Sequence, residues 1–192
     1  MMLIGLVGKK QCGKDTFCAM LTQLSSAPVQ RLAFGDALKQ EVAQKCEVPL
    51  HMIEQQKAVF RPMLQWWGTE FRRQFHGQDY WIRRLEEKLL GLQQSRADAG
   101  LLVVVTDVRF KNEADMIRLR GGLLIRIERP IPSNDDHVSE RQSELIAVDM
   151  TVTNDGSPDD LLEHAESLLR VLRSDAGQAI KPQAADTAAS TN

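Results

Sequence analysis

The sequence predicts an α/β fold built on a central parallel sheet flanked by helices, and three observations support this. Apolar stretches typical of strands alternate along the chain with amphipathic stretches typical of helices, as in repeated strand–helix–strand units. One strand, residues 101–107, is a continuous apolar run, which is typical of a strand buried on both faces of a parallel sheet. A glycine-rich loop joins the first strand to the first helix. We expect one domain over residues 1–173.

Length and composition limit the classes of protein that fit. With 192 residues and 43% hydrophobic content, the chain suffices for one α/β domain and not for two of ordinary size. The balance of 24 basic and 26 acidic residues speaks against nucleic acid or a membrane surface as the main partner. The three cysteines lack metal-ligand spacing, and the chain opens on a core strand instead of a charged leader. We expect a cytoplasmic protein with a small ligand.

The elements follow in order from the hydrophobic pattern. Strands are predicted at 2–7, 29–34, 101–107, 121–129 and 150–154, and helices at 16–24, 35–45, 80–92, 112–120 and 157–173. A long helix is predicted to begin at Arg61 and Pro62, because proline is tolerated in a first helical turn. Residues 35–95 are expected to form a helical insertion. This insertion would bind a substrate other than the ligand of the glycine-rich loop.

Two further segments are polar and are not expected to add to the core. Residues 130–142 are turn-rich and are predicted to form a mobile flap, or lid. Residues 174–192 are small and polar and are predicted to be a disordered tail. We find no internal repeat.

Residues 8–15 read GKKQCGKD, which matches the phosphate-binding pattern G-x-x-x-x-G-K-[ST] except at its last position. Between a strand and a helix, such a loop points backbone N–H groups and a helix N-terminus at one anion, and Lys14 adds a mobile positive charge. The expected ligand is a nucleoside triphosphate. A chance match in a glycine-rich turn is the alternative, and the two flanking elements speak against it.

Asp107 ends the apolar run 101–107. In α/β sheets the carboxyl ends of the strands face the ligand crevice, so Asp107 is expected beside the phosphate loop. Mg²⁺ prefers oxygen ligands and bridges phosphate oxygens, which makes Asp107 a candidate metal ligand. The alternative is an N-cap for the helix that begins near Phe110.

Asp15 stands where the loop pattern has a hydroxyl that touches Mg²⁺. A carboxylate beside a triphosphate is repulsive unless a cation lies between them, so Asp15 is the second candidate metal ligand. Thr16 is an imperfect substitute for the hydroxyl, because one helical step turns a side chain by about 100°. The alternative for Asp15 is an acid favoured by the helix dipole.

Two segments offer contacts for a second, phosphorylated substrate. The stretch AFGDALK carries Phe34, Asp36 and Lys39, the last two on one helical face. A polar stripe then recurs every three or four residues at Arg61, Gln65, Gly68, Thr69, Glu70 and Arg73. A solvated helix face would give the same pattern. The arginines favour substrate contact, because guanidinium groups match phosphate geometry.

Together, GKKQCGKDT, AFGDALK, RPMLQWWGTEFRR, VTDVRFKNEA and HVSE resemble the deoxynucleoside monophosphate kinases of tailed phages and their prophage relatives, over about residues 2–170. The aspartate after the loop lysine is typical of this group. The resemblance implies a three-layer P-loop NTPase fold of the nucleoside-monophosphate-kinase type. It also implies Mg²⁺ dependence and transfer of the ATP γ-phosphate to a deoxynucleoside 5′-monophosphate. For a phage-encoded protein the compartment is the host cytoplasm, and a homodimer is one open oligomeric state.

The resemblance also implies roles for individual residues. The catalytic residues are Lys14, Asp107 and Arg109, with Arg109 reaching across the transferring group. The ATP phosphates lie on Gly8, Lys9, Lys10, Gln11, Cys12, Gly13, Lys14, Asp15 and Thr16, and the adenine lies near Arg129, Asn154, Asp155 and Gly156. The acceptor is lined by Phe34, Asp36 and Lys39, its phosphate is held by Arg61 and Arg73, and its base or sugar contacts Gln65 and Thr69. One departure is the flap, where Arg141 is the only arginine close to HVSE in the sequence, whereas many nucleotide kinases have several arginines in the lid.

Two other functions remain open from the sequence. A kinase for a different small acceptor, such as dephospho-coenzyme A or phosphomevalonate, would share this style of loop. A nucleotide-binding interaction module without catalysis would also explain the loop, with the helix after Arg61 docking a partner.

Overall fold

The structure, a computed structural model, describes residues 1–95, 100–130 and 137–175. Almost all of the predicted tail and residues 131–136 of the predicted flap lie outside the described residues. The elements are β1 (Met2–Val7), α1 (Lys14–Leu24), β2 (Val29–Leu32), α2 (Phe34–Lys45), α3 (Leu50–Gln55), α4 (Lys57–Gln65), a π-helix η1 (Trp66–Arg73), α5 (Gln74–His76), α6 (Tyr80–Ser95), β3 (Leu102–Val108), α7 (Lys111–Leu119), β4 (Leu123–Glu128), α8 (Val138–Glu144), β5 (Met150–Thr153) and α9 (Pro158–Asp175).

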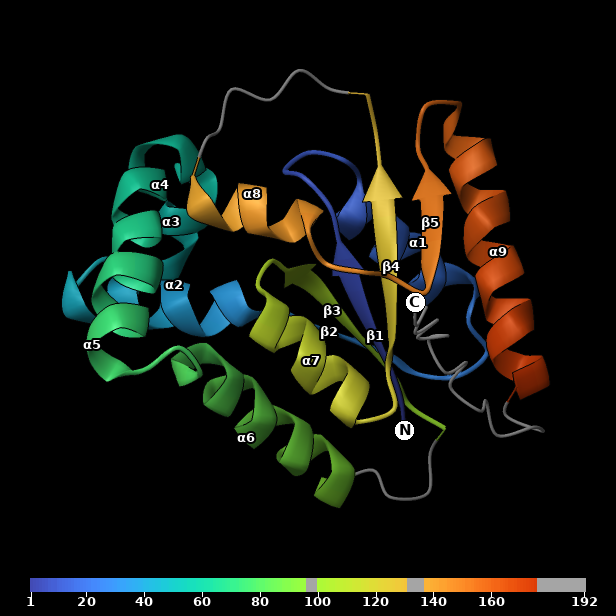
Figure 1. Ribbon diagram of the computed structural model, residues 1–192, viewed down its shortest axis with the longest axis horizontal. Helices are drawn as coiled ribbons and strands as arrows, with labels where there is room; N and C mark the ends of the chain where they lie inside the picture. The colour runs from blue at the N-terminus through green and yellow to red at the C-terminus, as the bar shows by residue number, and fades with distance from the viewer. Residues whose placement is uncertain (96–99, 131–136, 176–192) are drawn as a thin grey trace, which may run out of the picture.

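The five strands form one parallel sheet in the order β2-β3-β1-β4-β5. β1 and β3 pair along most of their length, from Met2 opposite Leu102 to Val7 opposite Val108. Because all strands run the same way, their carboxyl ends meet at one edge of the sheet (Figure 1). The phosphate loop follows β1 at this edge, and Asp107 lies at the end of β3. The predicted α/β fold class is confirmed.

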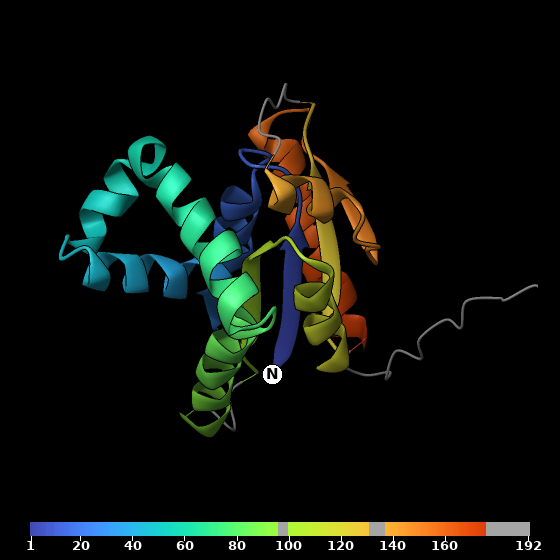
Figure 2. The ribbon, with the colours of Figure 1, turned by 60° about the vertical axis from the view of Figure 1, so that its left-hand side comes forward.

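Helices cover both faces of the sheet and give three layers (Figures 1 and 2). On one face, α1 and α9 pack with Phe17, Leu21 and Leu168 against the strands. On the other face, α6 and α7 contribute Leu85 and Ile117. Each helix buries the apolar stripe that its 3.6-residue period created in the sequence.

Helices α2, α3 and α4 stand out from the sheet as an arm, residues 34–65 (Figure 2). The arm has a small apolar cluster of its own, built around Val42, Ala43 and Ile53. α2 also contacts α6 and β3, and these contacts join the arm to the main core.

The prediction that a long helix begins at Arg61 was wrong, because α4 begins at Lys57 and Pro62 lies inside it. An internal proline removes one helical hydrogen bond and crowds the preceding turn. The helix then widens into η1, where a π-helix shifts the backbone pairing. Within η1, the carbonyl of Gly68 accepts a hydrogen bond from Trp81 Nε1 at 2.9 Å, and a Cβ at Gly68 would lie 3.0 Å from Leu38 Cδ2. Glycine lets α2 approach this wider turn.

The described part of the predicted flap is a helix, not a polar loop. α8 begins after His137, whose ring nitrogen Nδ1 accepts a hydrogen bond from the Ser139 N–H and caps the helix. Ser139, Glu140 and Ser143 are buried. The polar composition suggested an exposed segment, but these polar groups are buried because they bond to other polar groups of the site.

Candidate active site

Two glycines shape the phosphate loop. Gly8 has φ +143°, and a Cβ there would lie 2.4 Å from the Ile127 carbonyl oxygen of β4. Gly13 has φ +104°, and its Cβ would lie 2.4 Å from Asn154 Nδ2. Both positions therefore demand glycine for conformation and for space. The loop brings its backbone close to β4 and to the end of β5.

Lys14 opens α1 and is only 8% exposed. Its Nζ donates hydrogen bonds to the carbonyl oxygens of Gly8 at 2.6 Å and Lys9 at 2.5 Å, so the ammonium lies inside the curve of the loop. Asn154 Nδ2 donates to the Cys12 carbonyl at 2.8 Å and holds the loop from outside. This arrangement presents a positive charge and a helix N-terminus to one anion.

A cavity of about 340 Å³ opens beside the loop. Loop and α1 residues line one side of it, and the ends of β4 and β5 line the other, so the structure brings together Gln11, Gly13, Lys14, Asp15, Thr16, Arg129, Asn154 and Gly156. Asp155 lies elsewhere, at a second cavity of about 690 Å³ next to Gly8, Lys9 and α8. Residues that the sequence separates by more than a hundred positions therefore line the same cavity.

Asp107 holds the start of α2. Its two carboxylate oxygens accept hydrogen bonds from the N–H groups of Phe34 and Gly35, each at 2.8 Å. Burial raises the pKa of the Asp107 carboxyl above its ordinary value, and these N–H groups act against that rise. The helix that Asp107 caps follows the neighbouring strand β2, and is not the helix near Phe110 that the alternative expectation named. Sheet order explains this, because β3 lies next to β2.

Asp15 is exposed at the start of α1, with Arg31 Nε 3.7 Å from its carboxylate. Arg31 Nη1 also donates to Asp36 Oδ2 at 2.8 Å. Burial alone would lower the pKa of Arg31, but the charges of Asp36, Asp15 and Asp107 outweigh it and raise that pKa. Arg31 thus joins the loop side of the site to the arm. Sequence reasoning missed it, because an arginine on a short edge strand has no motif.

The residues expected to line the acceptor differ in their environments. Asp36 and Lys39 are partly exposed on α2, and Lys39 Nζ donates to Glu54 of α3 at 2.7 Å. Arg61, Gln65 and Thr69 are half-buried on α4 and η1. Phe34, in contrast, is 5% exposed and packs into the main core. This places Phe34 in the support of the site and not on its surface.

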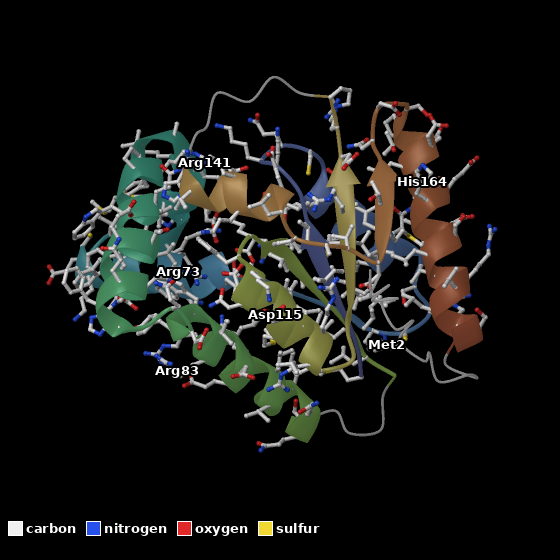
Figure 3. The ribbon with its side chains drawn as sticks, viewed as in Figure 1. Met2, Arg73, Arg83, Asp115, Arg141 and His164 are labelled. Carbon is white, nitrogen blue, oxygen red and sulfur yellow. The ribbon has the colours of Figure 1, made fainter. Side chains whose placement is uncertain are left out.

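Arg73 is buried between η1 and α7 (Figure 3). Its Nη2 donates to Glu113 Oε1, its Nη1 donates to the Gln78 carbonyl at 2.7 Å, and its guanidinium lies 3.9 Å from the centre of the Phe110 ring. The side chain that is predicted to hold a substrate phosphate is therefore paired with a buried acid in this structure. Glu113 in turn accepts from the Arg109 N–H at 2.7 Å.

Burial raises the pKa of Glu113 to about 7, while Arg73 lowers it and the charge of Asp107 raises it further. Sequence reasoning also missed this residue as a member of the site. A glutamate in the first turn of a helix is a capping signal, and it could have drawn attention to Glu113.

Arg109 lies between the end of β3 and α8. Its Nη1 donates to Glu140 Oε1 at 2.5 Å and contacts Ser139 Oγ at 3.4 Å. The other oxygen of Glu140 accepts from the Lys10 N–H of the phosphate loop at 3.1 Å. The HVSE motif therefore contacts the loop and the predicted catalytic arginine together, a role that its sequence did not reveal.

The strand–loop–helix arrangement and the five-stranded parallel sheet define a protein with the P-loop kinase fold. Two solved structures share this fold at low sequence identity. For TT1252 from Thermus thermophilus, the TM-score is 0.52 at 18% sequence identity, and the match covers 89% of this chain and 97% of the TT1252 chain. For the APS kinase CysC of Mycobacterium tuberculosis, in complex with AMPPNP and APS, the TM-score is 0.51 at 14% sequence identity. That match covers 90% of this chain and 97% of the CysC chain.

The chain belongs to the deoxynucleotide monophosphate kinase family, whose model matches residues 33–165. A putative deoxynucleotide monophosphate kinase of Acanthamoeba polyphaga mimivirus is 32% identical over 160 residues, which cover 73% of this chain and 81% of that protein. The deoxynucleotide monophosphate kinase of Enterobacteria phage T4 is 31% identical over 124 residues, which cover 64% of this chain and 50% of the phage protein.

In the part of the chain that the structure describes, no helix is long and apolar enough to cross a membrane.

Proposed function

We propose that this protein transfers the γ-phosphate of ATP to a deoxynucleoside 5′-monophosphate and so forms the diphosphate used in DNA precursor synthesis. The observation that supports this best is the phosphate loop with Lys14 inside it and a 340 Å³ cavity beside it, in a chain of the deoxynucleotide monophosphate kinase family. The viral and phage relatives support a host cytoplasm as the compartment. The proposed partner is the monophosphate substrate.

In the proposed reaction, an oxygen of the acceptor phosphate attacks the γ-phosphorus of ATP. The new P–O bond forms as the bond to the bridging β–γ oxygen breaks, and ADP leaves with that electron pair. No side-chain nucleophile is needed, so the protein acts by positioning two anions and stabilising their charge. Loop N–H groups and Lys14 would hold the ATP phosphates, and Arg109 would meet the transferring group.

The acceptor would lie between the arm and the loop. Lys39, Arg61, Gln65 and Thr69 would contact it, and Arg31 adds a positive charge next to Asp36. Arg73 would act through Glu113, which holds the backbone of Arg109. The cavity lined by Arg129, Asn154 and Gly156 is proposed for the adenosine part of ATP.

Mg²⁺ fits this site through one or two carboxylates and the substrate phosphates, which is its usual mode in kinases. The described residues contain no group of three or more His, Cys, Asp or Glu that could hold a metal alone. Asp15 fits best, because its side chain is 80% exposed beside the loop. Asp107 already accepts two backbone hydrogen bonds. Bound Mg²⁺ would supply neutralisation of the phosphate charge.

The test is acceptor-dependent ADP release from ATP and Mg²⁺ across the four common deoxynucleoside monophosphates, with AMP, dephospho-coenzyme A and phosphomevalonate in the same panel. We expect at least one deoxynucleoside monophosphate to raise ADP release well above the rate with ATP alone. Release only with one of the other acceptors would move the protein to another kinase class. No acceptor-dependent release at all would remove the kinase proposal.

Replacing Asp15 by alanine is expected to raise the Mg²⁺ concentration that gives half-maximal rate and to lower turnover, because the remaining ligands are fewer. The measurement is the initial rate as a function of Mg²⁺ at fixed ATP. The control is Asp115→Ala, which removes a partly exposed acid of α7 that is paired only with Lys111 among the described residues. Identical magnesium curves for Asp15→Ala and wild type would retire the metal role.

A further inference from the structure

Glu140 of α8 is buried between two groups that attract anions. It is 5% exposed, and its two carboxylate oxygens bond to different parts of the site. Oε1 accepts from Arg109 Nη1 at 2.5 Å, and Oε2 accepts from the Lys10 N–H at 3.1 Å. One side chain therefore links the phosphate loop after β1 to the arginine after β3.

The helix that carries Glu140 is fixed at several points. Ser143 Oγ donates to the Glu140 carbonyl at 2.7 Å, and Lys9 pairs with Glu144 at 2.6 Å. At the N-cap of α8, His137 Nε2 lies 3.7 Å from Glu70 Oε1 of η1. α8 therefore contacts the loop and η1, and Glu140 lies between those contacts.

Arg109 is oriented from both ends. Glu113 accepts its backbone N–H, while Glu140 and Ser139 engage Nη1. Within residues 1–95, 100–130 and 137–175, its Nε and Nη2 have no hydrogen-bond partner. The guanidinium thus keeps N–H groups that could donate to a phosphoryl oxygen, and its plane is set by the acid on the other edge.

We propose that Glu140 is a positioning residue for phosphoryl transfer: it sets Arg109 and the phosphate loop in fixed relation, so that the remaining N–H groups of Arg109 meet the transferring group. This inference rests on the proposed function. It gives the HVSE motif a specific task, which is to couple docking of α8 to the geometry of the charge-stabilising arginine. A misplacement of about 1 Å can cost on the order of a hundredfold in rate.

The test compares Glu140→Ala, Glu140→Gln and the matched truncation Gln142→Ala, an exposed residue of the same helix. We expect Glu140→Ala to lower kcat about tenfold to a hundredfold, with KM for ATP changed less than about threefold. Glu140→Gln keeps an acceptor oxygen and should recover part of kcat. Gln142→Ala should match wild type.

The decisive comparison is with Arg109→Ala. If Glu140 acts through Arg109, Glu140→Ala in the Arg109→Ala background should cost no more than about twofold further in kcat, because residues that act as a unit are not additive. A full, additive loss would overturn the proposal. An unchanged kcat with a lower KM for ATP would also overturn it. That result would mean that the Glu140 carboxylate occupies the position of a substrate phosphate and is displaced when ATP binds.

A measurement without substrate separates this inference from the proposed function. Amide hydrogen exchange in residues 8–13 should rise in Glu140→Ala and not in Gln142→Ala, because the Lys10 N–H loses its acceptor. If wild type phosphorylates no acceptor, the proposed function fails. Unchanged exchange in Glu140→Ala would overturn the link between α8 and the loop whatever the activity.

Discussion

Lys14→Ala is expected to lower acceptor-dependent ADP formation by on the order of a hundredfold to a thousandfold, the scale seen when one charge-stabilising donor is removed. The ammonium lies inside the phosphate loop on the carbonyls of Gly8 and Lys9. A bound triphosphate would offer it a stronger, charged acceptor. Without the lysine, the loop N–H groups remain, but the outer phosphates lose their nearest positive charge.

The measurement is the initial rate at saturating ATP and acceptor, with ATP binding followed separately. Lys111→Ala is the control, because Lys111 is 86% exposed and pairs with Asp115 on the outside of α7. Lys14→Arg should also be impaired, because the planar guanidinium group of arginine does not replace the compact ammonium group of lysine on its flexible side chain. A rate for Lys14→Ala within twofold of wild type would contradict the role of Lys14.

The sequence predicted the parts of the site that depend on local pattern. The residues Gly8 to Thr16 form a motif in which each glycine has a steric reason, and the structure places Gly8 to Gly13 between β1 and α1 and Lys14 to Thr16 in the first turn of α1. Asp107 was predicted from its place at the end of a strand, because strand ends in a parallel sheet meet at one edge, whereas Asn154 was predicted from the family resemblance. The types of the strands and helices were predicted from the hydrophobic period. The start of α4 was predicted wrongly, because Pro62 was assigned to the first helical turn and lies inside the helix.

What the sequence did not predict depends on partners from distant segments. Arg73 looked like a substrate arginine because its charge and spacing were visible, whereas the acid that holds it, Glu113, lies 40 residues later. Glu140 is 130 residues from its loop partner Lys10, and no periodicity connects them. Burial of polar residues in α8 could not be read from composition, because a polar segment is buried only when distant groups satisfy it.

Arg73→Ala is expected to destabilise the protein by about 3 to 5 kcal/mol, the cost of removing one partner of a buried ion pair. The side chains of Arg73 and Glu113 are each 3% exposed. The substitution leaves Glu113 buried without its cation and removes one of the two donors to the Gln78 carbonyl, which keeps its hydrogen bond from Asn112 Nδ2. Arg83→Ala is the matched control, because Arg83 is exposed on α6 and its side chain donates only to the His76 carbonyl among the described residues.

The loss of stability caused by Arg73→Ala should depend on pH. Burial raises the folded-state pKa of Glu113 to about 7, above its ordinary 4.5. Between these values the folded state binds more protons than the unfolded state, so stability falls as pH rises from the unfolded pKa to the folded one. Arg73 lowers the pKa of Glu113. Removing Arg73 raises that pKa further and extends the falling range to higher pH.

Urea unfolding at pH 6 and pH 8.5 would therefore show a larger difference between wild type and Arg73→Ala at the higher pH. The double variant Arg73→Ala with Glu113→Gln should lose most of this pH dependence, because an amide cannot ionise. It should also recover part of the stability, since no charge is left buried without a partner. A destabilisation that is equal at both pH values, or that survives unchanged in the double variant, would show that Arg73 contributes through packing on Phe110 and not through its charge.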